Sequence, residues 1–161
     1  MHGPSVIPIA ADVTNIYSLS PGIAPHLPVD GLVNNAGTNC LESFLEIKPE
    51  SYVKIMDLNL KAPIFLSQII VQSMIQHNVK GSIVNISSQA AISPFADHTC
   101  YMASKAALDS LSRSMSYELG QYGIRVNSVQ PTVVPTDLSE RFWSPEKAKP
   151  LISRMPLGRF A

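Results

Sequence analysis

Two short segments, Ser-Ile-Val-Asn-Ile at residues 82–86 and Ile-Arg-Val-Asn-Ser-Val at residues 124–129, enclose the stretch that decides the fold. Both are rich in Val or Ile, and they end in small or polar residues, Ser87-Ser88 and Gln130-Pro131. Between them, residues 101–119 repeat apolar side chains at helical spacing. A strand, a helix of this length and a second strand predict a right-handed βαβ unit with parallel strands.

The same alternation extends toward the amino terminus. Residues 31–33 (Gly-Leu-Val) run into Asn34-Asn35-Ala36-Gly37, and residues 5–10 (Ser-Val-Ile-Pro-Ile-Ala) precede Asp12-Val13-Thr14. Short apolar runs of this kind are typical of parallel strands buried on both faces, with functional loops at their carboxyl ends. The sequence therefore predicts an α/β fold with at least four parallel strands.

The segments between these strands differ in character. Residues 49–77 predict a long helix with a kink at Pro63. Residues 15–30 contain several Pro and Gly residues and predict a loop without room for a crossover helix. Residues 132–158 predict a long excursion with one or two short helices, and loops of this length often cover a binding site.

The composition excludes several classes of protein. The chain has 161 residues, with 12 Lys or Arg and 12 Asp or Glu side chains. It therefore lacks the excess of positive charge that is typical of proteins that bind nucleic acid or an anionic membrane. Residues 63–75 form the longest apolar tract, but polar side chains interrupt it. No signal peptide is visible. We therefore expect a cytoplasmic chain with neither a membrane nor a nucleic-acid partner.

The two cysteines predict neither a disulfide scaffold nor a metal site. Cys40 and Cys100 belong to no Cys-x-x-Cys or Cys/His cluster. Free cysteine behaves as a small hydrophobic residue, so we expect two buried or half-buried thiols. No metal ligand is indicated elsewhere in the sequence.

Tyr101 and Lys105 are the pair with the clearest chemical interpretation. Their spacing places both side chains on one face of the predicted helix. An ordinary tyrosine has a pKa of about 10 and is a poor base at neutral pH. A neighbouring cation favours the phenolate and brings Tyr101 within reach of acid–base chemistry. The same spacing is common in helices, so a purely structural role stays open for the pair taken alone.

Five signals in order carry a family resemblance: Asn34 to Gly37 after a strand, Asn59 in a helix, Ser88 at a strand end, the Tyr101–Lys105 pair, and a later strand leading to Pro131 and Thr136. Over nearly its whole length the chain resembles the short-chain dehydrogenase/reductase family. The resemblance implies a partial Rossmann-type, doubly wound parallel sheet that lacks the first two strands and the last one.

The resemblance also implies a role for four side chains. Tyr101 would be the general acid or base, Lys105 would lower its pKa and bind the nicotinamide ribose, and Ser88 would hold the substrate oxygen. Asn59 would position a water molecule in a proton relay. Hydride would come from the coenzyme, so the protein would supply orientation, a proton and electrostatic stabilisation. Adjacent strand residues point to opposite faces, so Ser87 and Ser88 cannot share one role, and the spacing favours Ser88.

Further residues would contact the coenzyme if the resemblance holds. They are Asn34, Ala36 and Gly37 on the adenosine side, Asp12 and Val13 near the adenine, and Val134 and Thr136 near the nicotinamide carboxamide. We expect NADP(H) rather than NAD(H), a small carbonyl or alcohol substrate, and a homo-oligomer formed through the two long helices.

The carboxyl-terminal segments resemble one branch of the family. Residues 130–136 and 156–161 look most like the carbonyl reductase and L-xylulose reductase branch, although Thr132 stands where many members have Gly. His98 and Trp143 could contact the substrate, but an exposed or capping histidine and a simply packed tryptophan are the alternatives. The substrate itself is not encoded in any motif that we identify.

The sequence departs from the family pattern at the phosphate-binding motif. None of its eight glycines forms the Gly-x-x-x-Gly-x-Gly fingerprint. We therefore expect residues 1–161 to be a single, truncated coenzyme-binding domain, with residues 132–158 as a substrate lid. Two functions stay open: an NAD(P)(H)-dependent oxidoreductase, or a catalytically impaired relative that acts as an interaction or dominant-negative subunit.

Overall fold

The computed structural model describes residues 6–136, 139 and 142–160. Its sheet has three parallel strands, β1 (Gly31–Asn34), β2 (Ser82–Ile86) and β3 (Arg125–Val129), in the order β1-β2-β3. Asn34 pairs with Asn85, and Ser82 pairs with Arg125. The structure thus confirms the predicted parallel α/β fold at these three strands.

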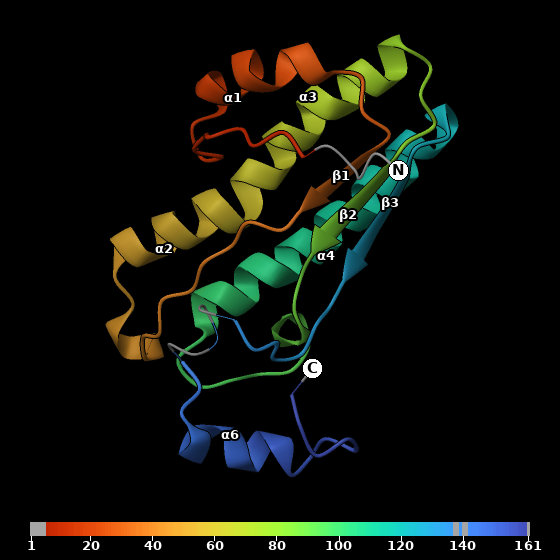
Figure 1. Cartoon of the computed structure of the whole chain (residues 1–161). Coiled ribbons are helices and arrows are strands. Elements are labelled where there is room, and N and C mark those ends of the chain that lie inside the picture. Colours follow the sequence, from red (N-terminus) through yellow and green to blue (C-terminus); the bar gives the residue numbers. More distant parts are fainter. Residues whose placement is uncertain (1–5, 137–138, 140–141, 161) are drawn as a thin grey trace.

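The long helices also lie where the sequence predicts them. They are α2 (Pro49–Met56) and α3 (Ala62–Gln76), joined by the π-helical turn η3 (Asp57–Lys61), and α4 (Thr99–Leu119). The short helix α1 (Ile16–Ile23) lies beside α3, and α6 (Pro145–Ile152) lies beyond the carboxyl ends of the strands (Figure 1). Short 3₁₀ turns complete the fold: η1 (Ala24–His26), η2 (Phe44–Glu46), η4 (Gln89–Ala91) and η5 (Gly120–Tyr122).

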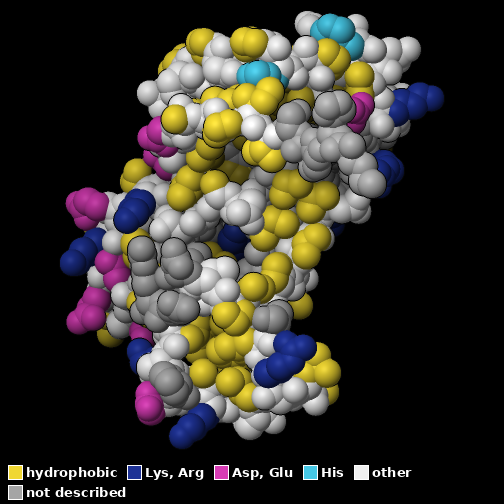
Figure 2. Space-filling view, viewed as in Figure 1, with side chains coloured by type: hydrophobic (Ala, Val, Ile, Leu, Met, Phe, Trp, Pro, Cys, Tyr) yellow, Lys and Arg dark blue, Asp and Glu magenta, His cyan; other side chains and the backbone are white. Residues whose placement is uncertain are grey.

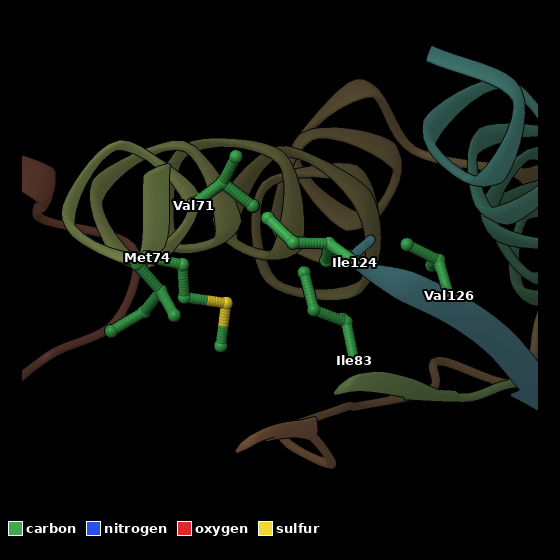
Figure 3. Packing of buried hydrophobic residues seen from close by; sticks show 6 residues of the cluster. Val71, Met74, Ile83, Ile124 and Val126 are labelled. Carbon is green, nitrogen blue, oxygen red and sulfur yellow. The ribbon is translucent and has the colours of Figure 1, made fainter. Parts of the chain in front are cut away.

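The hydrophobic core lies between α3, α4 and one face of the sheet. Alternate strand residues enter it, with Ile83 from β2 and Val126 from β3 packed against Val71 and Met74 of α3 (Figure 3). Partly buried residues of α4, Met115 and Leu119, pack against the same cluster. This core fixes the two helices on the sheet and so positions everything at the strand ends.

A network of buried amides and hydroxyls joins the same layers. Asn34 on β1 donates from Nδ2 to Asn85 Oδ1 on β2 (2.7 Å) and to Ser67 Oγ on α3 (3.0 Å). Asn85 in turn donates to Ser112 Oγ on α4 (2.8 Å). Because buried polar groups are stable only when paired, this network selects one register of the strands and one seating of both helices.

The prediction that the strands are buried on both faces is wrong for the described residues. Val33 is 60% exposed and Val129 is 47% exposed on the face opposite α3 and α4. The strands lie in front of α4 in Figure 1, and Figure 2 shows hydrophobic side chains on the surface there. The strand order runs in one direction, so both right-handed crossovers place their helices on the same side.

The predicted strand at residues 5–10 is also not observed. Residues 6–10 are exposed and belong to no strand, and Ser5 lies outside the described residues. A strand is held by hydrogen bonds to a neighbour, and no described residue pairs with this segment in the sheet. An apolar composition alone was therefore an insufficient signal.

Residues 15–30 form α1 and η1 where the sequence predicted a loop. Pro21 lies inside α1, where it cannot donate to the carbonyl of Tyr17. Leu19 is nevertheless buried and α1 packs against α3, while Ile23 reaches the core cluster. Burial of this apolar side outweighs the helix-breaking tendency of Pro21.

The kink predicted at Pro63 takes the form of the π-helical turn η3. Pro63 has no N–H, so the carbonyl of Asn59, four residues earlier, cannot receive the usual helical hydrogen bond. The Ala62 N–H bonds the carbonyl of Asp57, five residues back. The extra residue in this turn brings Asn59 into the interior, where it is fully buried.

Residues 49–76 form one helical segment that is long and apolar enough, by length and composition, to cross a membrane. In its most apolar window, 44% of the residues are buried inside the molecule. Val71 and Met74 from this segment belong to the core, as expected of the central helix of a globular domain. The absence of a membrane partner stays a prediction.

Replacing Asn85 should test the buried network. Asn85→Ala removes one hydrogen-bond partner each from Asn34 and Ser112 in the interior, and we expect a loss of about 2 kcal/mol in the free energy of unfolding. Asn127→Ala on the neighbouring strand is the matched control, because Asn127 is exposed. Urea unfolding of both variants measures the difference, and equal losses would contradict the structural role of the network.

Candidate active site

A pocket of about 710 Å³ lies at the carboxyl ends of the strands. Its walls come from the loops after all three strands, from the start of α4 and from the excursion after β3. The lining includes Gly37, Ser88, Tyr101, Lys105, Thr132 and Trp143. Ligands of open parallel sheets bind at this end of the strands, so the fold and the pocket agree on where a site should be.

Tyr101 and Lys105 project from the first two turns of α4 into this pocket. The Lys105 Nζ lies 5.7 Å from the centre of the Tyr101 ring and donates to the carbonyl of Ile86 (2.7 Å). Burial lowers the pKa of Lys105 to about 8, although the negative charge of Asp109 opposes part of this shift. Burial raises the pKa of Tyr101, and a hydrogen bond from Ser88 opposes this effect only in part. The expected lowering of this pKa by Lys105 is therefore wrong for the structure without coenzyme, because the loss of water around the phenol has the larger effect.

The two serines after β2 have different surroundings. Ser87 is buried and donates from Oγ to the backbone carbonyl of Lys105 (3.1 Å), which anchors α4 to the strand end. Ser88 caps η4 by accepting from the Ala90 N–H (3.1 Å), and its hydroxyl faces Tyr101. Both serines line the pocket, but only Ser88 is set against the phenol.

Asn59 lies behind the pocket rather than in its lining. Its side chain bonds the backbone of Thr38 in both directions, accepting from N–H (2.8 Å) and donating to the carbonyl (2.9 Å), and it donates to Ser104 Oγ (3.0 Å). Asn59 therefore clamps the loop after β1 to α4. Pro63 also removes the usual helical donor to the backbone carbonyl of Asn59.

The structure brings some of the expected coenzyme-binding residues together and leaves others apart. Ala36, Gly37, Val134 and Thr136 line the pocket. The other three, Asn34, Asp12 and Val13, are absent from its lining. Asn34 is buried in the amide network, and Asp12 lies in an exposed turn where hydrogen bonds from Thr14 lower the pKa of its carboxyl group.

A row of aromatic rings runs from the carboxyl-terminal excursion to Tyr101. Centroids are 6.0 Å apart for Phe160 and Trp143, 5.9 Å for Trp143 and Phe95, 5.8 Å for Phe95 and His98, and 6.2 Å for His98 and Tyr101. His98 and Trp143, left open by the sequence, thus both line the pocket. Sequence reasoning missed Phe95, Phe142 and Asn39, since nothing in their local spacing marks them as pocket residues.

Metal-ligating residues do not gather in the part of the chain that the structure describes. No group of three or more His, Cys, Asp or Glu residues lies there at a spacing that could hold a metal ion. Cys40 and Cys100 are free and half-buried, which confirms the prediction for the two thiols.

The nicotinamide coenzyme implied by the resemblance can be compared with the residues present. A Cβ added at Gly37 would lie in van der Waals contact, 3.5 Å from both Lys105 Nζ and Asn59 Oδ1, so Gly37 directly borders the lysine expected to bind the ribose. Thr132 Oγ1 is buried and has no hydrogen-bond partner among the described residues. These features fit a nicotinamide and its ribose, whereas the glycine motif for the pyrophosphate is not in this sequence.

Sequence comparison supports the same interpretation. A family model for short chain dehydrogenases matches residues 2–147. L-xylulose reductase from Caenorhabditis elegans is 47% identical over 98% of this chain and 63% of that protein. L-xylulose reductase from Mus musculus is 43% identical over 98% of this chain and 65% of that protein. The chain therefore spans slightly less than two thirds of the length of these relatives.

Solved structures share the fold. Gluconate 5-dehydrogenase from Burkholderia cenocepacia, in complex with NADP and tartrate, superposes with a TM-score of 0.90 at 25% identity, over 95% of this chain and 62% of that one. A 4-hydroxyisoleucine dehydrogenase complexed with NADH has a TM-score of 0.86 at 32% identity, over 94% and 64%. Since the family model covers most of the chain and the fold agrees, this chain belongs to the short-chain dehydrogenase family.

Proposed function

We propose that the protein is an NAD(P)(H)-dependent oxidoreductase that interconverts a carbonyl group and a secondary alcohol. The observation that carries the proposal is the position of Tyr101, which faces Ser88 in the pocket and lies beside the buried ammonium of Lys105. A proton donor, a hydrogen-bonding hydroxyl and a cation at one end of a pocket can stabilise the oxyanion that forms when a ketone is reduced.

Each side chain then has one task. The coenzyme supplies the hydride. Tyr101 donates its phenolic proton to the carbonyl oxygen, and the high pKa of its phenol keeps that proton in place at neutral pH. Ser88 holds the same oxygen, and Lys105 stabilises the phenolate and binds the ribose. The side chain of Asn59 holds the loop after β1. Its backbone carbonyl accepts a hydrogen bond from a water molecule that returns protons from solvent.

We propose NADP(H) in preference to NAD(H). A relative from Sus scrofa, 37% identical over 98% of this chain, is named carbonyl reductase (NADPH) 2. Solved relatives are described with either NADP or NADH, so the fold accepts both. In this chain Ala36 and Gly37 would lie on the adenosine side, and Val134 and Thr136 would approach the nicotinamide carboxamide.

For the substrate we propose a short polyhydroxy ketone. Relatives are named for L-xylulose and, in Gallus gallus, for D-erythrulose, and the latter protein is 40% identical to this chain. The pocket suits such a ligand because its lining combines polar Gln89, Asn39 and His98 with the aromatic rings of Phe95 and Trp143. Residues 132–158 would serve as the lid, since Phe142 and Trp143 line the pocket, although residues 137, 138, 140 and 141 of this segment lie outside the described residues.

The oxidoreductase would be a homo-oligomer that associates through its long helices. Tyr117 on α4 is 90% exposed, and Tyr52 and Val53 on α2 are half exposed. The uncovered apolar face of the sheet supports a second candidate, an interaction or dominant-negative subunit without turnover. Thermal unfolding with millimolar NADPH or NADH separates the two, because a bound coenzyme raises the melting temperature by mass action.

Replacing Tyr101 tests the chemistry directly. Tyr101→Phe removes the proton donor and little else, and we expect kcat to fall by at least about a thousandfold with nearly unchanged coenzyme affinity. Ketone-dependent NADPH oxidation measures kcat, and coenzyme fluorescence measures the affinity. Tyr122→Phe, a partly exposed tyrosine outside the pocket, is the control. Retained turnover in Tyr101→Phe would refute the mechanism.

The pH dependence should reflect Lys105. Its pKa of about 8 means that the ammonium is lost as pH rises through that value, and with it the charge that stabilises the phenolate. We expect the rate of ketone reduction to fall above about pH 8. A steady-state pH profile measures this, and a rate that stays constant up to pH 9.5 would contradict the role of the ammonium.

Trp143 should affect the substrate more than the coenzyme. Trp143→Ala removes an aromatic wall worth about 1.4 kcal/mol, so we expect the KM for the ketone to rise about tenfold. The KM for NADPH should stay within about twofold. Phe44→Ala, which removes an exposed ring outside the pocket, should change neither constant.

A further inference from the structure

Asp109 is a buried carboxylate to which the proposed mechanism gives no task. It lies on α4 and is 6% exposed. Its Oδ2 accepts from Gln130 Nε2 at the end of β3 (2.5 Å), while its Oδ1 has no hydrogen-bond donor among the described residues. A buried carboxylate with one neutral donor is costly unless a cation balances it.

Lys105 is a buried ammonium group that in turn requires a negative charge nearby. It lies four residues before Asp109, on the same face of α4, and is 4% exposed. Its Nζ is bonded to the neutral carbonyl of Ile86. Burial lowers the pKa of Lys105, and Asp109 is the group whose charge opposes that effect.

The other groups around Lys105 leave Asp109 as its counter-charge. Tyr101 on α4 and His98 at its start are the other titratable groups in the pocket lining, and neither is an anion at neutral pH. The described pocket residues in the loops after β1, β2 and β3 all have uncharged side chains. The residue of η3 that contacts α4 here, Asn59, is also uncharged. Arg113, one turn after Asp109, is exposed.

Gln130 fixes where the carboxylate lies. It directly precedes Pro131, whose carbonyl accepts from the Gln89 N–H (2.9 Å) in the loop that follows Ser88. The Asp109–Gln130 bond therefore joins α4 to two of the loops that form the pocket. The carboxylate is thereby held on the face of α4 that carries Lys105, and the two charged groups interact across more than the 4.0 Å of a direct ion pair.

We propose that Asp109 is a positioning residue, a buried carboxylate that keeps Lys105 in its ammonium form and thereby sets the pH range in which Tyr101 works. The catalytic consequence rests on the proposed function. The charge of Lys105 itself exists without coenzyme or turnover, so it can be measured separately.

Asp109→Asn isolates the charge, since the Asn oxygen can still accept from Gln130. Competitive labelling with acetic anhydride, followed by mass spectrometry across pH 6–11, reports the titration of each lysine amine in the intact chain. We expect the midpoint of Lys105, about 8 in the parent, to fall by about one unit in Asp109→Asn. The exposed Lys48 and Lys54 serve as internal references.

Glu118→Gln is the matched control, because it removes one negative charge from the exposed far end of α4. Its Lys105 midpoint should equal that of the parent. In Asp109→Asn, the alkaline limb of the activity profile should move to lower pH by the same amount as the labelling midpoint. An unchanged Lys105 midpoint in Asp109→Asn overturns the inference, whereas a parent chain without turnover overturns only the proposed function.

A second measurement covers the case in which Asp109→Asn does not fold. Lys105→Met removes the charge to be balanced, so adding Asp109→Asn to it should raise the melting temperature above that of Lys105→Met alone. Asp109→Asn should lower the melting temperature only when Lys105 is present. Equal losses in both backgrounds would show that Asp109 serves the fold without regard to Lys105.

Discussion

The hydrogen bond from Lys105 Nζ to the carbonyl of Ile86 joins a charged group on α4 to the last residue of β2. An ammonium this deeply buried persists only where an acceptor is held in place for it. Ser87 secures the backbone of Lys105 from the strand side, and Asn59 secures α4 from the side of η3 through Ser104. Helix α4 therefore cannot slide along the sheet without leaving a buried charge unpaired.

Much of this arrangement could be predicted from the sequence because its signals are local. Residues 82–86 form β2 as expected, and the helix predicted at 101–119 begins only two residues earlier. Tyr101 and Lys105 lie on α4, whose period of 3.6 residues puts both side chains on one face, and Ser88 lies in the turn just after β2. A correct reading of those elements was therefore enough to bring the three residues to one end of the sheet.

The failures have a common cause, which is that burial depends on neighbours that a local pattern does not show. Residues 6–10 are as apolar as a strand but pair with no described residue, and α1 forms in spite of Pro21 because α3 covers it. Asn34 looked like a ligand-binding residue, yet Asn85 and Ser67 engage its amide. The role of Asn59 as a clamp depends on contacts with Thr38 and Ser104, which no spacing rule indicates.

The register of the sheet also has a consequence for how the chain reaches its native state. Asn34 and Asn85 are hydrogen-bonded partners 51 positions apart, and Ser82 pairs with Arg125. Neither strand pair can form before a long loop has closed, and closure costs entropy that only the completed pairing returns. Helix α4, whose helical backbone hydrogen bonds are local, can form first and bring β2 and β3 together, so that β1 joins a sheet that already has a covered face. The segment that carries Tyr101 and Lys105 would then also be the organising centre of folding.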